Sequence, residues 1–288
     1  MGKYFTGHIP DPPAVVARRK GFHILKAKRG LGVAPLPLKT NNRAKLLTAL
    51  GGPGILNQKD TGSCVGHAIA SAITLRFALM GKPIPLVSPV GVYDVARMIS
   101  RSPNADGSLP PLSDDGTEPN LAYSGLAEWG ACSAATWGDY PATSATINDE
   151  PTPQDMMLTA DFKLSGAYFL DGTAGDQYLR DLMTALAAAY PLSYALAASN
   201  NTFQGYTGGV LGPMDDAVDH ENYLIDYEWD GSNLSSLIVY GTNSWSEGWG
   251  ESDVVGIGGG MYRANRQFIA KYSDSTAVVD VSAIGSEQ

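Results

Sequence analysis

The chain has 288 residues, of which 44% are hydrophobic and 17% are charged. This composition supplies enough apolar residues for a core and excludes wholesale disorder. Two cysteines are too few for a disulfide framework, and no apolar run reaches the ~20 residues of a membrane span. Residues 1–12 have no apolar stretch of the kind that signal peptides carry.

The net charge of −9 combines two oppositely charged regions. Residues 1–45 contain ten basic residues and one acidic residue, so the other 243 residues, with 10 basic and 28 acidic side chains, have a net charge of −18. The basic segment either lies on this acidic body or in solvent, or it docks to an acidic partner such as a protein or assembly. No aromatic-rich basic groove accompanies it, which argues against nucleic acid as the partner.

The first half of the chain is mainly helical in pattern. Residues 1–38 are proline-rich and weakly periodic, which predicts an extended arm, and residues 51–54 predict a loop. An apolar run after Cys64 predicts a buried helix that stops at residues 81–83. Further helices are expected from Ser88-Pro89 through Met98 and over 118–129, with polar loops at 101–119 and 137–156.

The second half changes to strand patterns. A helix is expected over 177–190, ending before Pro191. Strands are expected at 192–196, 223–227 and 236–240. A helical half followed by a strand-rich half predicts an α+β protein with two lobes, and the cleft between such lobes is a natural place for a site.

Three residues that lie far apart in the sequence meet the needs of a nucleophilic cysteine. Cys64 lies where a polar loop gives way to the first long helix, a position at which the helix N-terminus favours a thiolate. His220 precedes a predicted strand, and Asn243 follows another. An imidazole that reaches the thiol, held in one tautomer by a third group, completes such a site.

Around these residues the sequence resembles the papain-like cysteine peptidases, over roughly residues 33–270. The matching blocks occur in the family's order: Gln58 with Gly62-Ser63-Cys64, then 203–220 ending in Val218-Asp219-His220, then Asn243-Ser244-Trp245 with Gly248-Trp249-Gly250-Glu251. Two further stretches, at 86–93 and at Asp115-Gly116-Thr117, resemble bacterial and viral members.

The resemblance implies the papain-like α+β fold: a helical lobe, an antiparallel β-barrel-like lobe, and an active-site cleft between them. We therefore expect a basic N-terminal arm over 1–45, a helical lobe with the cysteine over 46–155, and a β-rich lobe with the histidine and asparagine over 156–288.

The resemblance also implies a role for each site residue. Cys64 is the expected nucleophile and forms a thioester, His220 the acid and base, and Asn243 the group that orients His220. Gln58 and the backbone N–H of Cys64 are expected to form the oxyanion hole. The expected substrate is a peptide or protein, without a metal or cofactor, and the residues expected to border it are Gly116, Val218, Asp219 and Trp245.

The sequence departs from the family pattern directly after the histidine, where Glu221 replaces a small residue. If this carboxylate faces the cleft, we expect it to raise the pKa of His220. The 1–45 arm does not resemble the family's long inhibitory propeptide. Of the other histidines, His8 and His23 are expected in solvent and His67 packed within its helix. Cys132 is expected to be a buried free thiol, and the pairs at 114–115 and 215–216 to be solvated loop carboxylates.

Two other functions remain open from the sequence. One is a papain-fold structural component of a larger assembly such as a virus particle, with weak, gated or lost peptidase activity. The other is a related amide chemistry such as transpeptidation. The low cysteine content favours a reducing compartment, so we expect a cytoplasmic location, with the virion as the alternative.

Overall fold

The structure, a computed structural model, describes residues 5–50, 54–82, 86–137, 143–149, 162–251, 259–273 and 276–283. The predictions for 51–53, Pro83, 138–142 and 150–156 lie outside these residues. Among the described helices, none is long and apolar enough to cross a membrane.

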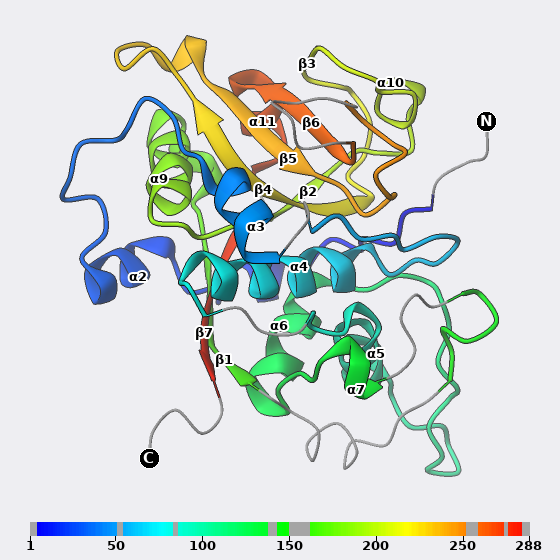
Figure 1. The fold of residues 1–288 in the computed structure, drawn as a ribbon. Coiled ribbons are helices and arrows are strands. Elements are labelled where there is room, and N and C mark those ends of the chain that lie inside the picture. The colour runs from blue at the N-terminus through cyan, green and yellow to red at the C-terminus, as the bar shows by residue number, and fades with distance from the viewer. Residues whose placement is uncertain are drawn as a thin grey trace.

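The helix that begins at the cysteine is the centre of the fold. Helix α4 (Cys64–Leu79) is buried along nearly its whole length, and it confirms the helix expected after Cys64. Figure 1 shows α4 running between the sheet on one side and α5 and α6 on the other. Its many alanines favour helix and let neighbouring elements approach closely. The helix ends before Gly81, whose φ of +71° suits glycine.

Two further predicted helices are confirmed beside α4. Helix α5 (Pro89–Ser100) begins at Ser88, whose side-chain oxygen accepts a hydrogen bond from the backbone N–H of Gly91 at 2.9 Å. Helix α6 (Pro119–Glu128) packs against α5. The short helix α7 (Ala134–Trp137) also contacts α5.

The second half of the chain forms a seven-stranded sheet in the order β1-β7-β2-β4-β5-β6-β3. The pairings are antiparallel except that of β3 with β6. The strands are β1 (Phe162–Phe169), β2 (Leu192–Leu196), β3 (Val210–Leu211), β4 (His220–Glu228), β5 (Ile238–Thr242), β6 (Met261–Asn265) and β7 (Ala277–Ala283).

The three strands expected from sequence are present, with one displaced. The strand expected at 192–196 is β2, and the one at 223–227 lies within β4. β5 starts two residues later than expected because residues 234–236 form a 3-10 turn, η2 (Leu234–Ser236). Four strands were not predicted, and two of them, β1 and β7, pair with each other over distant parts of the chain.

Short helices cover the sheet. Helix α9 (Asp176–Ala187) confirms the helix expected over 177–190, but it ends three residues earlier because Ala189 adopts a φ of +60° before Pro191. The remaining short elements are η1 (Gly172–Ala174), α10 (Asn201–Gln204) and α11 (Arg266–Lys271).

The expectation of an extended N-terminal arm is wrong for part of its length. The segment contains α1 (Pro13–Val16) and α2 (Phe22–Arg29), and α3 (Asn42–Leu50) follows it. Helix α2 forms because Phe22 and Leu25, one turn apart, are buried against the largest apolar cluster. This helix was not predicted because a single apolar pair in a short segment gives only a weak periodic signal.

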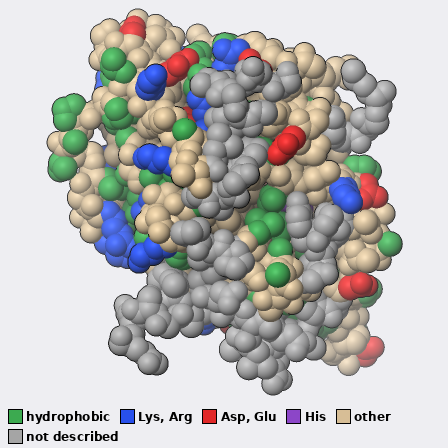
Figure 2. Space-filling view, in the orientation of Figure 1, with side chains coloured by type: hydrophobic (Ala, Val, Ile, Leu, Met, Phe, Trp, Pro, Cys, Tyr) green, Lys and Arg blue, Asp and Glu red, His purple; other side chains and the backbone are tan. Residues whose placement is uncertain are grey.

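Basic side chains of the arm pair with the acidic body of the same chain. Lys26 lies 2.7 Å from Asp181, and both Lys28 and Arg29 pair with Asp280, at 3.2 and 2.8 Å. Figure 2 shows Lys and Arg side chains gathered on the side of the molecule that carries α2. These contacts support the intramolecular reading of the basic segment for the side chains involved.

A buried carboxylate attaches the start of α3 to strand β4. Asp226 accepts hydrogen bonds from the backbone N–H groups of Asn42 and Arg43, at 2.8 and 3.1 Å, and from the Thr40 hydroxyl at 2.6 Å. The Arg43 guanidinium completes the set at 2.9 Å, and it stacks over the ring of Tyr240. The far end of the same strand carries His220.

We expect Asp226→Ala to lower the free energy of unfolding by about 3–5 kcal/mol, because it leaves the Arg43 charge and two backbone donors buried without their acceptor. Denaturant unfolding followed by circular dichroism measures the change. Asp215→Ala is the control, since it removes an exposed pair with Lys271 worth less than about 1 kcal/mol. Equal effects of the two substitutions would contradict this account.

Candidate active site

Cys64 is the first residue of α4, and its side chain is fully buried. The loop before it runs against the segment after β5, where Asn57 forms a β-bridge with Trp245. The backbone of Glu221, the residue after His220, hydrogen-bonds to the Cys64 thiol. The structure therefore brings the start of α4 next to the start of β4.

His220 is held by Asn243 through one ring nitrogen. Its Nε2 lies 2.7 Å from Asn243 Oδ1, and that oxygen also accepts the backbone N–H of Ser244 at 2.8 Å. An oxygen that accepts a backbone N–H requires Nε2 of the histidine to carry a proton. In the neutral ring Nδ1 is then the basic nitrogen, and it has no hydrogen-bond partner among the described residues. The Trp245 ring lies over the imidazole, with 4.8 Å between centroids.

Gln58 is fixed by the loop that carries the asparagine. Its Oε1 accepts the hydroxyl of Ser244 at 2.6 Å, and its backbone N–H donates to the Ser244 carbonyl at 2.8 Å. These contacts turn Nε2 toward the cleft, where it donates to the carbonyls of Thr61 and Phe5 at 2.8 and 3.3 Å.

Residues 5–9 of the chain itself pass between the segments that carry Cys64, Thr117 and Asp219, and the place that they occupy is called the cleft. The Phe5 carbonyl accepts hydrogen bonds from Gln58 and, at 3.2 Å, from the indole N–H of Trp245. The backbone N–H of His8 donates to the Asp219 carbonyl at 3.0 Å. Thr117 pairs with the segment on both sides, accepting from Ile9 at 3.0 Å and donating to the Gly7 carbonyl at 2.9 Å. The segment is bound as an extended peptide through its backbone.

Only glycine fits at the point where this segment passes Cys64. A Cβ atom at Gly7 would lie 1.9 Å from the Gly62 carbonyl oxygen, and the backbone of Gly7 hydrogen-bonds to the Cys64 thiol. A Cβ atom at Gly116 would lie 2.2 Å from the Gly7 carbonyl oxygen. The backbones at 7, 62 and 116 are therefore in close contact.

Asp114 bonds to segments that lie around Gly7, so the expectation that it is a solvated loop charge is wrong. Its carboxylate accepts the backbone N–H of Gly62 at 2.9 Å and the hydroxyl of Tyr93 at 2.9 Å. That hydroxyl in turn accepts the N–H of Gly116 at 3.0 Å. Donors of two distant segments converge on one carboxylate, a pairing that local sequence does not reveal. Its neighbour Asp115 is exposed as expected.

Burial holds the cysteine and histidine in their neutral forms. Burial raises the pKa of the Cys64 thiol to about 12, and the charge of Glu221 adds to this effect. Burial lowers the pKa of His220 to about 4, against the opposing effect of its bond to Asn243. The expectation that Glu221 raises the pKa of His220 is wrong, because the glutamate carboxylate pairs instead with His8, at 2.9 Å.

The other expected site residues differ in whether they contact residues 5–9. Gly116 and Trp245 contact the bound segment, and so does the backbone of Asp219, whose carboxylate turns away to accept the N–H of Ala198 at 2.7 Å. Val218 packs against the apolar core. Sequence reasoning missed Thr117 and Ser244 as cleft residues, although both lie inside the motifs that carry the family resemblance.

The structure also tests the predictions for the other histidines and for Cys132. His8 was expected in solvent, but it is buried, because it enters the cleft with the N-terminal segment. His23 is exposed, and His67 is packed within α4 with its Nδ1 3.0 Å from the Ser63 carbonyl. Cys132 is a buried free thiol. In the part of the chain that the structure describes, no three His, Cys, Asp or Glu side chains gather to hold a metal ion.

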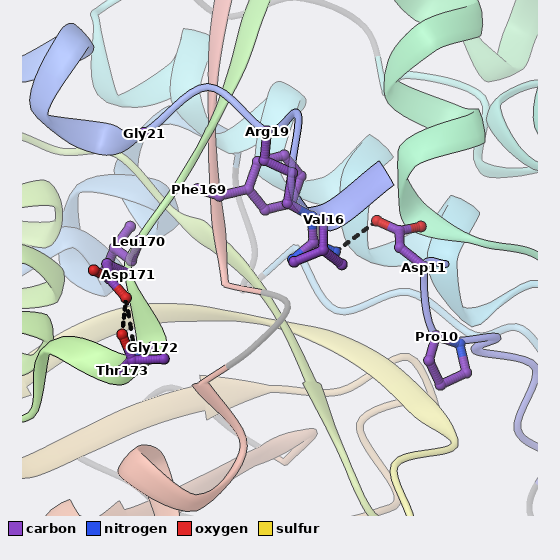
Figure 3. Close-up of a pocket in the computed structure, with 10 residues that line it drawn as sticks. All are labelled: Pro10, Asp11, Val16, Arg19, Gly21, Phe169, Leu170, Asp171, Gly172 and Thr173. Carbon is purple, nitrogen blue, oxygen red and sulfur yellow. Dashed lines mark hydrogen bonds and ion pairs between the residues drawn. The ribbon is translucent and has the colours of Figure 1, made fainter. Parts of the chain in front are cut away.

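A cavity of about 500 Å³ lies outside the cleft, between the arm and the end of β1. Figure 3 shows its lining, in which the Arg19 guanidinium covers the Phe169 ring and pairs with Asp11 at 2.6 Å. None of the cleft residues described above lines it.

Comparison with known proteins gives the family. The sequence model described as papain family cysteine protease matches residues 114–267, more than half of the chain, which include His220 and Asn243. Cys64 and Gln58 lie before the matched segment.

Solved structures share the fold. The cysteine protease xylellain from Xylella fastidiosa is 18% identical with a TM-score of 0.65, over 97% of this chain and 98% of that one. Digestive procathepsin L2 from Tenebrio molitor larval midgut is 19% identical with a TM-score of 0.66, over 96% and 78%. Digestive procathepsin L 3 from the same tissue is 21% identical with a TM-score of 0.62, over 92% and 76%.

We expect Gly7→Val to raise the rate of Cys64 alkylation by iodoacetamide at least about tenfold at neutral pH, because the added side chain expels residues 5–9 and returns the thiol toward its ordinary pKa of ~8.5. In the unchanged chain the rate should rise with pH toward about 12, as the buried thiol ionises. Peptide mass mapping measures both, with Cys132 as an internal reference. Thr6→Val is the control, and equal rates in all three chains would rule out the block.

Proposed function

Because the chain belongs to the papain family of cysteine proteases, we propose that it hydrolyses peptide bonds through a thioester on Cys64. The observation that carries this proposal is the bond of 2.7 Å between His220 Nε2 and Asn243 Oδ1. It fixes the tautomer whose Nδ1 accepts a proton, in a histidine whose neighbouring residue hydrogen-bonds to the Cys64 thiol.

The proposed reaction has two steps, and in each of them one proton moves through His220. His220 takes the thiol proton, and the thiolate sulfur attacks the peptide carbonyl carbon. The carbon–nitrogen bond breaks, the amine leaves with the proton from His220, and a thioester remains on Cys64. Water then gives a proton to His220, and its oxygen displaces the sulfur, which releases the acid. His220 returns its proton to the sulfur and so restores the thiol.

Gln58 is the proposed side-chain donor for the oxyanion that forms in each step. Its Nε2 already donates to a peptide carbonyl, that of Phe5, at 3.3 Å, which supports access of a peptide oxygen to this amide. Ser244 holds the amide by its oxygen, so the NH₂ group stays directed into the cleft. A donor fixed in advance stabilises developing negative charge without reorganising.

Hydrolysis requires residues 5–9 to leave the cleft, because they occupy the backbone positions that a substrate needs. Neutral forms of Cys64 and His220 are the resting state of the buried pair. Admission of solvent and substrate removes the burial that shifts both pKa values and favours the thiolate–imidazolium pair. The cytoplasmic location, the virion alternative and an acidic partner for the arm stay predictions.

In the Gly7→Val chain we expect Gln58→Ala to lower kcat/KM for peptide hydrolysis by about 10²–10³-fold, the usual cost of one oxyanion donor. A fluorogenic peptide library followed by mass spectrometry measures the rate. Gln177→Ala, in an exposed side chain on α9, is the matched control and should leave the rate unchanged. Cys64→Ala should abolish hydrolysis; persistence of the same cleavages in that variant would overturn the mechanism.

A further inference from the structure

The carboxylate of Glu221 is buried close to Cys64, in a setting where an unpaired charge is costly. Its side chain is fully buried, and so is that of His8, which lies 2.9 Å away. Burial raises the pKa of Glu221, and its contact with His8 lowers it. A carboxylate in such a place needs a cationic or hydrogen-bond-donating partner.

The side chains around this carboxylate come from the sheet and from α6. Glu221 belongs to β4, Ser193 to β2, and Tyr123 to α6. The Tyr123 hydroxyl and the Ser193 hydroxyl hydrogen-bond to each other, and the Ser193 hydroxyl lies close enough to Glu221 to lower the pKa of its carboxyl. All three side chains are nearly inaccessible to solvent. We call this site the Glu221 pocket.

Among the neighbouring titratable groups, Glu221 determines the sign of the electrostatic potential in the Glu221 pocket. Asp11 lies close enough for its charge to raise the pKa of Glu221, but it is paired with Arg19 at 2.6 Å. His220, on the same strand, has its pKa lowered to about 4 by burial and is neutral above that pH. The potential at the pocket is therefore negative whenever Glu221 is ionised.

His8 enters the Glu221 pocket from a peptide that is bound by its backbone. The N–H of His8 and the carbonyl of Gly7 pair with Asp219 and Thr117, at 3.0 and 2.9 Å. Backbone bonds of this kind do not depend on the side chain that follows Gly7, so they do not select histidine at position 8. The contact that depends on the side chain is the one between His8 and Glu221.

We propose that the Glu221 pocket selects substrates with a basic side chain (histidine, lysine or arginine) next to the residue that lies at Cys64. His8 is then the chain's own occupant of the substrate pocket, and Gly7 the residue at the nucleophile. The inference rests on the proposed peptidase function and makes Glu221 a residue that determines specificity.

The test uses two irreversible probes that differ in one charge. Both are N-acylated dipeptidyl chloromethyl ketones with glycine next to the reactive carbon, as Gly7 is next to Cys64. Residues 5–9 run parallel to the backbone at Thr117, with His8 after Gly7, whereas a probe that ends at the reactive carbon carries its second side chain before the glycine. The test therefore places the probe antiparallel to residues 5–9, so that this side chain takes the place of His8. One probe carries lysine before the glycine and the other norleucine, which has the same chain without the ammonium group. The labelling rate of Cys64 is measured by intact mass in the full-length Gly7→Val chain.

We expect the lysine probe to label Cys64 at least about tenfold faster than the norleucine probe, a difference of about 1.4 kcal/mol. Glu221→Gln should bring the ratio close to one. Glu228→Gln, at the exposed far end of the same strand, should leave the ratio unchanged. The first comparison needs no change at Glu221, so it stands even if that variant fails to fold.

Two results would overturn the inference while leaving the peptidase intact: norleucine labelling at least as fast as lysine labelling, or a lysine preference that survives Glu221→Gln. Absence of labelling by either probe in the folded Gly7→Val chain is a different result. It would overturn the nucleophilic role of Cys64, and the specificity with it.

Discussion

The three residues 243–245 hold the site together. Asn243 accepts the imidazole N–H of His220, Ser244 fixes the amide of Gln58, and the indole of Trp245 covers the imidazole. One short loop after β5 therefore sets the tautomer of the base and the direction of the oxyanion donor. Because Gln58 precedes α4, the same loop also joins the strand-rich half of the chain to the helix that carries the cysteine.

The N-terminal segment is part of this assembly. Its cleft residues are bound through backbone hydrogen bonds, and helix α2, which follows α1 further along the chain, is fixed by buried apolar side chains and by ion pairs to Asp181 and Asp280. Tethering of this kind gives residues 5–9 a high local concentration at the cleft. Closure of the site therefore does not depend on how dilute the protein is.

The elements with regular local patterns could be predicted from the sequence. The apolar helix after Cys64, the Ser88-Pro89 start of α5 and strand β2 all follow from periodicity and capping. Strand β1, by contrast, depends on pairing with β7 at the other end of the sequence, which no local pattern shows. The burial of His8 also depends on such a pairing, since a histidine in a polar, proline-rich segment gives no sign of entering a cleft.

The contact of His8 with Glu221 joins the first residues of the chain to the strand that carries the base. A substitution at either position alters both what the cleft admits and how firmly it is closed. The two positions are thus expected to vary together during evolution. A lineage that replaced Glu221 by an apolar residue would be under selection to replace His8 as well. The residue at position 8 would then match the side chain that the cleft prefers in a substrate.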